Sequence, residues 1–227
     1  MPLDDRTRRS IIRDAVGIGV ATGAYGLSFG AISVTAGLSL LQTAALSLLM
    51  FTGASQFAMV SLIGGGGSPV AGAATAVLLG TRNAFYGLRL SRVIGGPGQR
   101  RALGAQFVID ETTAMAVAPD SVDAARLAFW ATAVSVFTLW NVGTLVGAVG
   151  AQAIPDPKTL GLDAAAPAAF LALLAPRMTG RHLWAVSLTA ALVALASAPL
   201  VPAGIPVLLA ALVTVVAGLR LEARGKG

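Results

Sequence analysis

Long runs of apolar residues follow one another along most of this chain, and their length constrains its fold more than any other feature. An α-helix needs about 20 predominantly apolar residues to cross the roughly 30 Å of hydrocarbon in a bilayer. We therefore predict an all-α fold, a polytopic integral membrane protein with seven or eight embedded helical segments, at least one of them broken or re-entrant. The predicted segments are Ala15–Ala36, Leu38–Ile63, Val70–Leu88, Ala102–Ala118, Leu127–Ala151, Leu160–Ala175, Leu183–Ala198 and Ile205–Leu219.

The composition excludes most soluble folds and most enzyme classes. Hydrophobic residues make up 56% of the 227 residues and charged residues only 11%, whereas about a quarter of an average soluble chain is charged. The absence of cysteine excludes thiolate metal sites and thiol catalysis, and a single histidine argues against a zinc site. Nucleotide-binding and hydrolase motifs are also missing from the sequence. We expect no enzyme activity and no cofactor.

The formal charge of +6 comes from basic residues that flank the apolar runs. This placement is typical of short cytoplasmic loops in membrane proteins, and it argues against a nucleic-acid partner. We predict a basic cytoplasmic tail at residues 1–14, a single transmembrane domain at 15–221 and a basic tail at 222–227, with both termini in the cytoplasm. The first run is longer than the apolar core of a signal peptide, which favours a retained span.

One basic loop conflicts with eight complete spans. Eight crossings would place residues 89–101, which carry four arginines, outside the cell, against the positive-inside rule. Either this loop violates the rule, or an earlier segment enters and leaves the membrane by the same face. The small and polar stretch Phe51–Gln56 is where we place such a break. Whether residues 38–63 and 102–118 span fully is left open.

Glycines recur at helical spacing in two of the runs. Gly19, Gly23, Gly26 and Gly30 follow one another in steps of three or four residues, and Gly143, Gly147 and Gly150 do the same in a later run. Such spacing places small residues along one side of a helix, where they allow a second helix backbone to approach closely. We predict that both stripes are packing seams rather than ligand contacts.

Four ionisable residues lie inside apolar runs: Arg82, Asp110, Glu111 and Asp163. Each would cost about 2.5 to 3.5 kcal/mol at the centre of a lipid-facing helix, so we expect them to face protein or water. One interpretation is that Arg82 pairs with a carboxylate as an internal strut. The other is that the four line a substrate or ion path. We favour this second interpretation because three carboxylates and one arginine leave a net negative charge, which a strut does not need. Burial disfavours the charged form of a carboxylate, which makes one of these acids a candidate proton carrier.

Two interrupted segments add a second kind of candidate site. Asp163 lies in a stretch that ends at Pro167 and is short enough to be a half-helix, and the break at Gly53–Gln56 offers the same geometry earlier in the chain. The amide end of a half-helix attracts anions, and transporters use such ends to bind substrate carboxylates.

Five motifs together resemble one protein family. In order and spacing, they are similar to the AzlC family of branched-chain amino acid transport proteins, over about residues 15 to 180. The motifs are Tyr25–Gly30, Phe51–Phe57, Thr81–Gly87, Asp110–Thr112 and Leu160–Phe170. The resemblance implies a location in the bacterial inner membrane and the large subunit of a two-component exporter of valine, leucine, isoleucine and often methionine. It also implies a small hydrophobic partner of the AzlD type and export driven by the proton gradient.

The sequence thus predicts a proton-coupled secondary exporter of branched-chain amino acids. Arg82 or a half-helix amide end would bind the substrate carboxylate, and one of the three acids would hold the ammonium or the proton. The alternative is a non-transporting membrane scaffold in which the charges are struts. The candidate substrate- and ion-binding residues are Gly53, Ser55, Gln56, Arg82, Asn83, Asp110, Glu111, Thr112, Asp163 and Pro167. The preferred amino acid, the direction of net flux, the coupling ion and the oligomeric state stay open.

Overall fold

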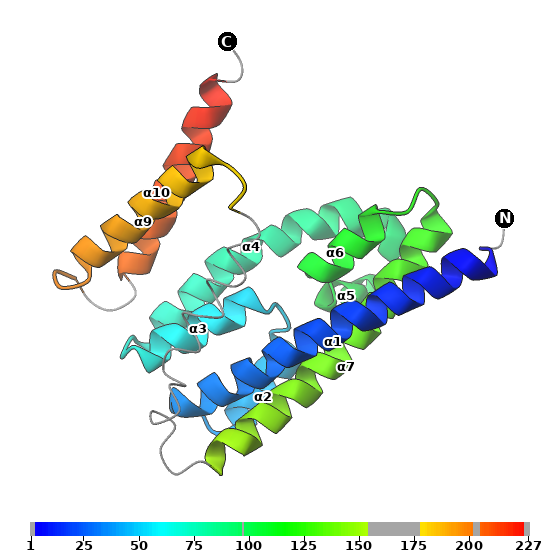
Figure 1. The fold of residues 1–227 in the computed structure, drawn as a ribbon, viewed down its shortest axis with the longest axis horizontal. Helices are drawn as coiled ribbons and strands as arrows, with labels where there is room; N and C mark the ends of the chain where they lie inside the picture. The colour runs from blue at the N-terminus through cyan, green and yellow to red at the C-terminus, as the bar shows by residue number, and fades with distance from the viewer. Residues whose placement is uncertain (1–2, 97, 154–177, 202–204, 225–227) are drawn as a thin grey trace.

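The computed structural model describes residues 3–96, 98–153, 178–201 and 205–224 (Figure 1). These residues form nine helices and no strand, which confirms the predicted all-α class for the described part of the chain. The helices are α1 (Asp5–Thr35), α2 (Leu40–Leu49), α3 (Ala54–Gly64), α4 (Pro69–Ile94), α5 (Gly98–Gln106), α6 (Asp110–Val117), α7 (Val122–Gln152), α9 (Arg181–Ser197) and α10 (Ile205–Arg224). The predicted segment at 160–175 lies outside the described residues.

Polar side chains set the starts of the helices. The Asp4 carboxylate accepts hydrogen bonds from the backbone N–H and the hydroxyl of Thr7 at the start of α1, and these bonds hold the pKa of Asp4 below its ordinary value. Ser39, Ser68 and Ser121 cap α2, α4 and α7 in the same way, each through a serine hydroxyl that accepts a backbone N–H three residues on. Such caps satisfy N–H groups that have no acceptor within the helix.

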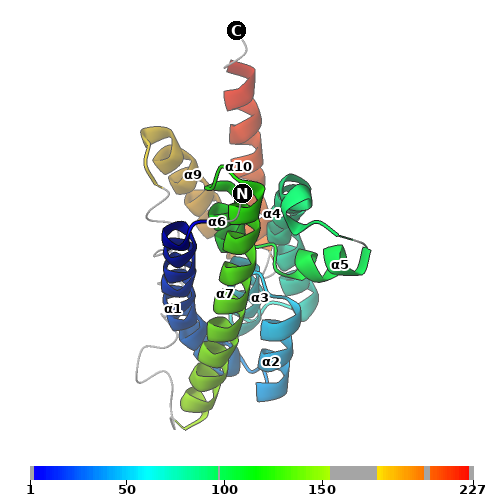
Figure 2. The same cartoon turned by 90° about the vertical axis from the view of Figure 1, so that its right-hand side faces the viewer.

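Helices α1 and α7 form the central helix pair of the molecule. Both have 31 residues, they pack along most of their length, and they run parallel with their N-terminal ends at the same end of the molecule (Figure 2). At that end, which we call the N-terminal end, Ile11 packs with Ala124 and Ala128. Helices α1 and α7 are both long and apolar enough to cross a membrane. The number of membrane crossings in the whole chain stays a prediction.

Glycine makes the close packing of α1 against α7 possible. A Cβ added to Gly26 would lie 2.6 Å from the carbonyl oxygen of Trp140, and one added to Gly30 would collide with the carbonyl oxygen of Thr144. From the other side, added Cβ atoms at Gly143 and Gly147 would collide with backbone carbonyls of α1. These contacts confirm the predicted packing seam. The inclusion of Gly150 in the stripe was wrong, because Gly150 is exposed and no atom of the described residues lies within 4 Å of its Cβ position.

Helices α2 and α3 form a hairpin that enters and leaves the body at one end. The first hairpin, residues 40–64, begins just after α1 ends. Its last residue, Gly64, returns to the same place, since a Cβ added there would lie 3.1 Å from the Cβ of Ala36. Helix α4 then runs from this end back to the N-terminal end, where the Arg126 side chain of α7 donates a hydrogen bond to the carbonyl of Val93 at 3.1 Å.

Helices α5 and α6 form a second hairpin, residues 98–117, which enters from the N-terminal end. It begins just after α4 ends there, and it leads directly into the start of α7 at the same end. Its two helices have nine and eight residues. At 1.5 Å per residue, each is less than half as long as the hydrocarbon of a bilayer is thick. The two hairpins therefore enter the body from opposite ends.

Helices α9 and α10 pack against each other beyond this body (Figure 1). The groove between them is lined mainly by alanine, valine and leucine, with Thr189 and Arg220 at its polar positions. Many of their leucine side chains are exposed, among them Leu192, Leu195 and Leu219.

Replacing Gly30 with alanine is expected to destabilise the protein by about 2 kcal/mol, because the new methyl group would meet backbone atoms of α7 that cannot move aside. The measurement is denaturant unfolding of the purified protein in detergent. Gly17→Ala is the matched control on the same helix, since nothing lies within 4 Å of its Cβ position and alanine favours helix. Equal stability of the two variants would contradict the seam.

Candidate functional site

The first hairpin breaks where the sequence predicts. Helix α2 ends at Leu49 and α3 begins at Ala54, with Gly53 in a left-handed conformation (φ +62°) between them. The fully buried Gln56 side chain bridges the break. Its Oε1 accepts the backbone N–H groups of Thr52 (3.3 Å) and Gly53 (3.0 Å), and its Nε2 donates to the carbonyl of Leu46 (2.9 Å).

The second hairpin contains a break that the sequence analysis missed. Residues 102–118 were expected as one short segment, but α5 ends at Gln106 and α6 begins at Asp110. The buried Thr112 hydroxyl accepts the backbone N–H of Ile109 at 3.0 Å and donates to the carbonyl of Phe107 at 2.7 Å. Two adjacent acids in a first turn are a helix-start signal, so Asp110 and Glu111 could have revealed the break.

The two breaks are built alike and meet. Gln56 and Thr112 each stand three residues beyond the residue that caps a half-helix, and each accepts that residue's N–H. Phe51 and Phe107, at the tips, pack edge to face with ring centroids 6.3 Å apart, and Phe137 of α7 contacts both rings. The rings fill the space between the hairpin tips, next to a buried aromatic cluster that includes Phe29, Phe57 and Trp140.

Helix α4 brings a charge to the start of one half-helix. Its Arg82 forms an ion pair with Asp110, the first residue of α6, with Nη2 and Oδ2 3.0 Å apart. The two side chains are 26% and 24% exposed, so the pair is shielded but reachable. A carboxylate in the first turn of a helix is also favoured by the helix dipole. The pairing of Arg82 with a carboxylate is what the strut interpretation expects, and whether the pair also lines a substrate or ion path stays a prediction.

Helix α4 also packs along α3, through the side of the helix that carries Gly72 and Gly80. A Cβ added to Gly72 would lie near Met59, and one added to Gly80 would lie 3.8 Å from the hydroxyl of Ser55. Because the two helices run antiparallel, the following turn of α4 brings Asn83 level with the start of α3. The middle of α4 thus lies near the amino-terminal ends of both α3, through Gly80 beside Ser55, and α6, through Arg82 beside Asp110.

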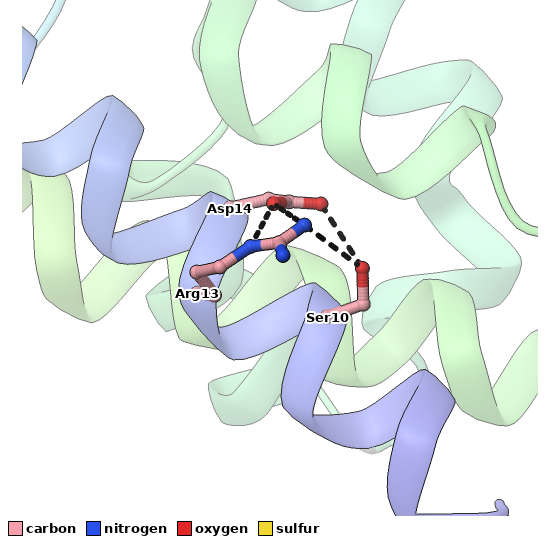
Figure 3. Close-up of polar contacts among 3 residues, drawn as sticks. All are labelled: Ser10, Arg13 and Asp14. Atoms are coloured by element: carbon pink, nitrogen blue, oxygen red, sulfur yellow. Dashed lines mark hydrogen bonds and ion pairs between the residues drawn. The ribbon is translucent and has the colours of Figure 1, made fainter.

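An ion pair near the N-terminus differs from the Arg82–Asp110 pair. Arg13 and Asp14 of α1 lie 3.0 Å apart, and Ser10 joins them, on the surface of the helix (Figure 3). Their side chains are 78% and 47% exposed. Exposed pairs of this kind contribute about 0 to 1 kcal/mol, because water and salt screen them. The less exposed Arg82–Asp110 pair has more to lose when one partner is removed.

Several buried polar atoms around α3, α4 and α6 have no hydrogen-bond partner among the residues that the structure describes. Those at or next to the two breaks and the middle of α4 are Thr52 Oγ1, Ser55 Oγ, Arg82 Nε, Asn83 Oδ1 and Thr113 Oγ1, and others lie elsewhere at Thr43, Ser61, Thr132 and Trp140. Such atoms are rare in folded proteins, and water or a ligand commonly satisfies them. Donors and acceptors are both represented, which suits a ligand that has both kinds of group.

The structure separates the predicted site residues by role. Gln56 and Thr112 close the breaks within their own hairpins, whereas Ser55, Arg82 and Asn83 present unpartnered atoms beside the half-helix starts. Glu111 is half-buried in the first turn of α6. Asp163 and Pro167 lie outside the described residues. The polar residues absent from the predicted set are Thr52, Gln106 and Thr113. Thr52 lies within the Phe51–Gln56 stretch and Thr113 directly follows Asp110–Thr112, so both adjoin predicted residues, whereas Gln106 lies between Ala105 and Phe107 without a motif of its own.

A family model described as AzlC protein matches residues 17–154, which is more than half of the chain. The chain belongs to the AzlC family. The matched region runs from α1 to α7 and so contains both hairpins and the Arg82–Asp110 pair. The AzlC family is a transporter-type family associated with branched-chain amino acid transport, and it generally works with AzlD. No curated protein and no solved structure matches the chain.

Replacing Gln56 with leucine is expected to lower the free energy of unfolding by about 3 kcal/mol. The variant leaves two backbone N–H groups and one carbonyl without their partner in a buried position, at about 1 kcal/mol each or more. Thermal unfolding in detergent measures the loss. Gln152→Leu, at the exposed end of α7, is the control, and a Gln56→Leu protein as stable as this control would show that the bridge contributes nothing.

Proposed function

We propose that this AzlC-family protein is a proton-coupled secondary exporter of branched-chain amino acids that works in the bacterial inner membrane with a small AzlD-type subunit. The observation that supports it most is the Arg82–Asp110 pair at the start of a half-helix. A partly shielded ion pair beside unpartnered polar atoms is costly in a molecule with so apolar a surface, and intramembrane charges of this kind are functional by default.

The half-helices suit a zwitterionic substrate. The starts of α3 and α6 carry partial positive charge and can stabilise a carboxylate, and Arg82 adds a full positive charge close by. A carboxylate among Asp110, Glu111 and Asp163 can hold the substrate ammonium or the transported proton. In this proposal, binding of the substrate carboxylate to Arg82 weakens the Arg82–Asp110 pair and leaves Asp110 free to take up a proton.

The opposite entry of the two hairpins agrees with the distribution of arginine. With the N-terminal end of the body in the cytoplasm, α1, α4 and α7 cross the membrane and the two hairpins are re-entrant from opposite faces. Residues 89–101 then lie in the cytoplasm beside the basic N-terminus, as the positive-inside rule requires. This topology removes the conflict that eight complete spans create.

The proposal is tested by counterflow of labelled leucine in vesicles that contain this chain and its AzlD-type partner. We expect leucine uptake above empty vesicles, and competition by valine and isoleucine. Absence of leucine movement with folded protein present would overturn the proposal and favour the scaffold.

The scaffold alternative has one observation in its favour, since Arg82 and Asp110 are paired as a strut would be. We expect the charge-neutral double variant Arg82→Gln with Asp110→Asn to assemble with its partner subunit but to lose export by about 100-fold, a loss typical of removing a charged interaction of about 3 kcal/mol. Export assays on purified complexes measure this. Full export by the double variant would make both residues structural.

A second variant concerns the coupling. Asp163→Asn is expected to abolish proton-driven accumulation while leaving membrane insertion intact, because the amide cannot carry a proton. Accumulation against a gradient is compared with counterflow in the same vesicles. Undiminished accumulation would remove Asp163 from the proton path.

A further inference from the structure

Gln106 joins the two hairpins. It is the last residue of α5, and its side-chain Nε2 donates to the carbonyls of Leu48 and Leu49 at 3.1 Å each. These carbonyls belong to the last turn of α2, where the final four C=O groups of a helix have no partner within the helix. The second hairpin thus satisfies acceptors of the first.

Gln56 and Thr112 act within their own hairpins. Gln56 bonds to Leu46, Thr52 and Gly53 of the first hairpin, and Thr112 bonds to residues of the second. Gln106, by contrast, makes two side-chain hydrogen bonds from the second hairpin to the first. The apolar contacts between the tips, the edge-to-face packing of Phe51 with Phe107 and the packing of Ile109 in the same core cluster as Phe51 and Phe57, have no directional hydrogen bond.

We propose that Gln106 couples the two hairpins, so that the tip of the first opens to water only when the amide of Gln106 leaves the carbonyl end of α2. The side chain is suited to this because it presents N–H donors to the partly negative end of a helix dipole. It is a positioning residue, half-buried rather than sealed in the core, so it can exchange these carbonyls for water. The coupling is a property of the fold and does not rest on the proposed transport activity.

The absence of cysteine from the chain allows a direct test. Thr52→Cys places a thiol in the first hairpin, at a half-buried residue whose hydroxyl oxygen is buried and makes no described hydrogen bond. The rate at which N-ethylmaleimide alkylates this thiol in the full chain, in lipid vesicles, reports how often the tip opens. Met50→Cys, three residues before Gly53, is a second reporter if the Thr52→Cys protein is not monodisperse.

The reporter is combined with changes at Gln106. Gln106→Leu removes the donor, and Gln106→Glu keeps the shape but sets a carboxylate against two carbonyls. Both are expected to speed alkylation about tenfold, the factor that one net hydrogen bond represents. Gln106→Lys keeps a donor and is expected to stay at the original rate. Gln99→Leu, on the exposed first turn of α5, is the matched control and is expected to change nothing.

Two results would overturn the proposal. One is an unchanged alkylation rate in both Gln106→Leu and Gln106→Glu, and the other is a rate in Gln106→Lys as high as in Gln106→Leu, which indicates a packing role. Alkylation needs no substrate, so its outcome is separate from that of the transport assay. A protein that fails leucine counterflow but shows the Gln106 effect loses the exporter function and keeps the coupling.

Discussion

The structure depends on how backbone groups are satisfied where a helix stops inside an apolar body. No water is available there by default, so each interrupted helix needs side chains to replace the missing partners. Gln56 and Thr112 do this at the starts of α3 and α6, and Gln106 does it at the end of α2. Without these three side chains, the two breaks would be the least stable places in the molecule.

The breaks in turn determine where charge can reside. A continuous helix has its partial charges at its two ends, far from the middle of a membrane-sized body, whereas a half-helix brings an end to that depth. Asp110 occupies the first position of such a half-helix and receives Arg82 from α4. The rigid frame for this arrangement is the α1–α7 seam, whose glycines let two backbones meet without intervening side chains.

The sequence predicts the parts of this fold that depend on local pattern. Glycine spacing predicts the seam, and the small and polar stretch predicts the first break. The Arg82–Asp110 pair corresponds to the less favoured of the two interpretations of the buried charges. The sequence pattern does not predict the second break, because Phe107, Val108 and Ile109 are as apolar as the helices beside them. The role of Gln106 is not predicted for a different reason. Its hydrogen-bond partners are 57 and 58 residues away in the sequence, and they depend on where the hairpins end. Tertiary contacts of this range leave no mark on local periodicity.

If the two hairpins enter from opposite faces and meet beside α4, then the two loops around α4 lie on opposite sides of the membrane. Gly65→Cys lies before α4 and Gly98→Cys lies after it, at exposed positions of a chain that has no other cysteine. We expect a membrane-impermeant maleimide to label Gly65→Cys in intact cells and to label Gly98→Cys only after permeabilisation. The reverse pattern, which eight complete spans require, would contradict it.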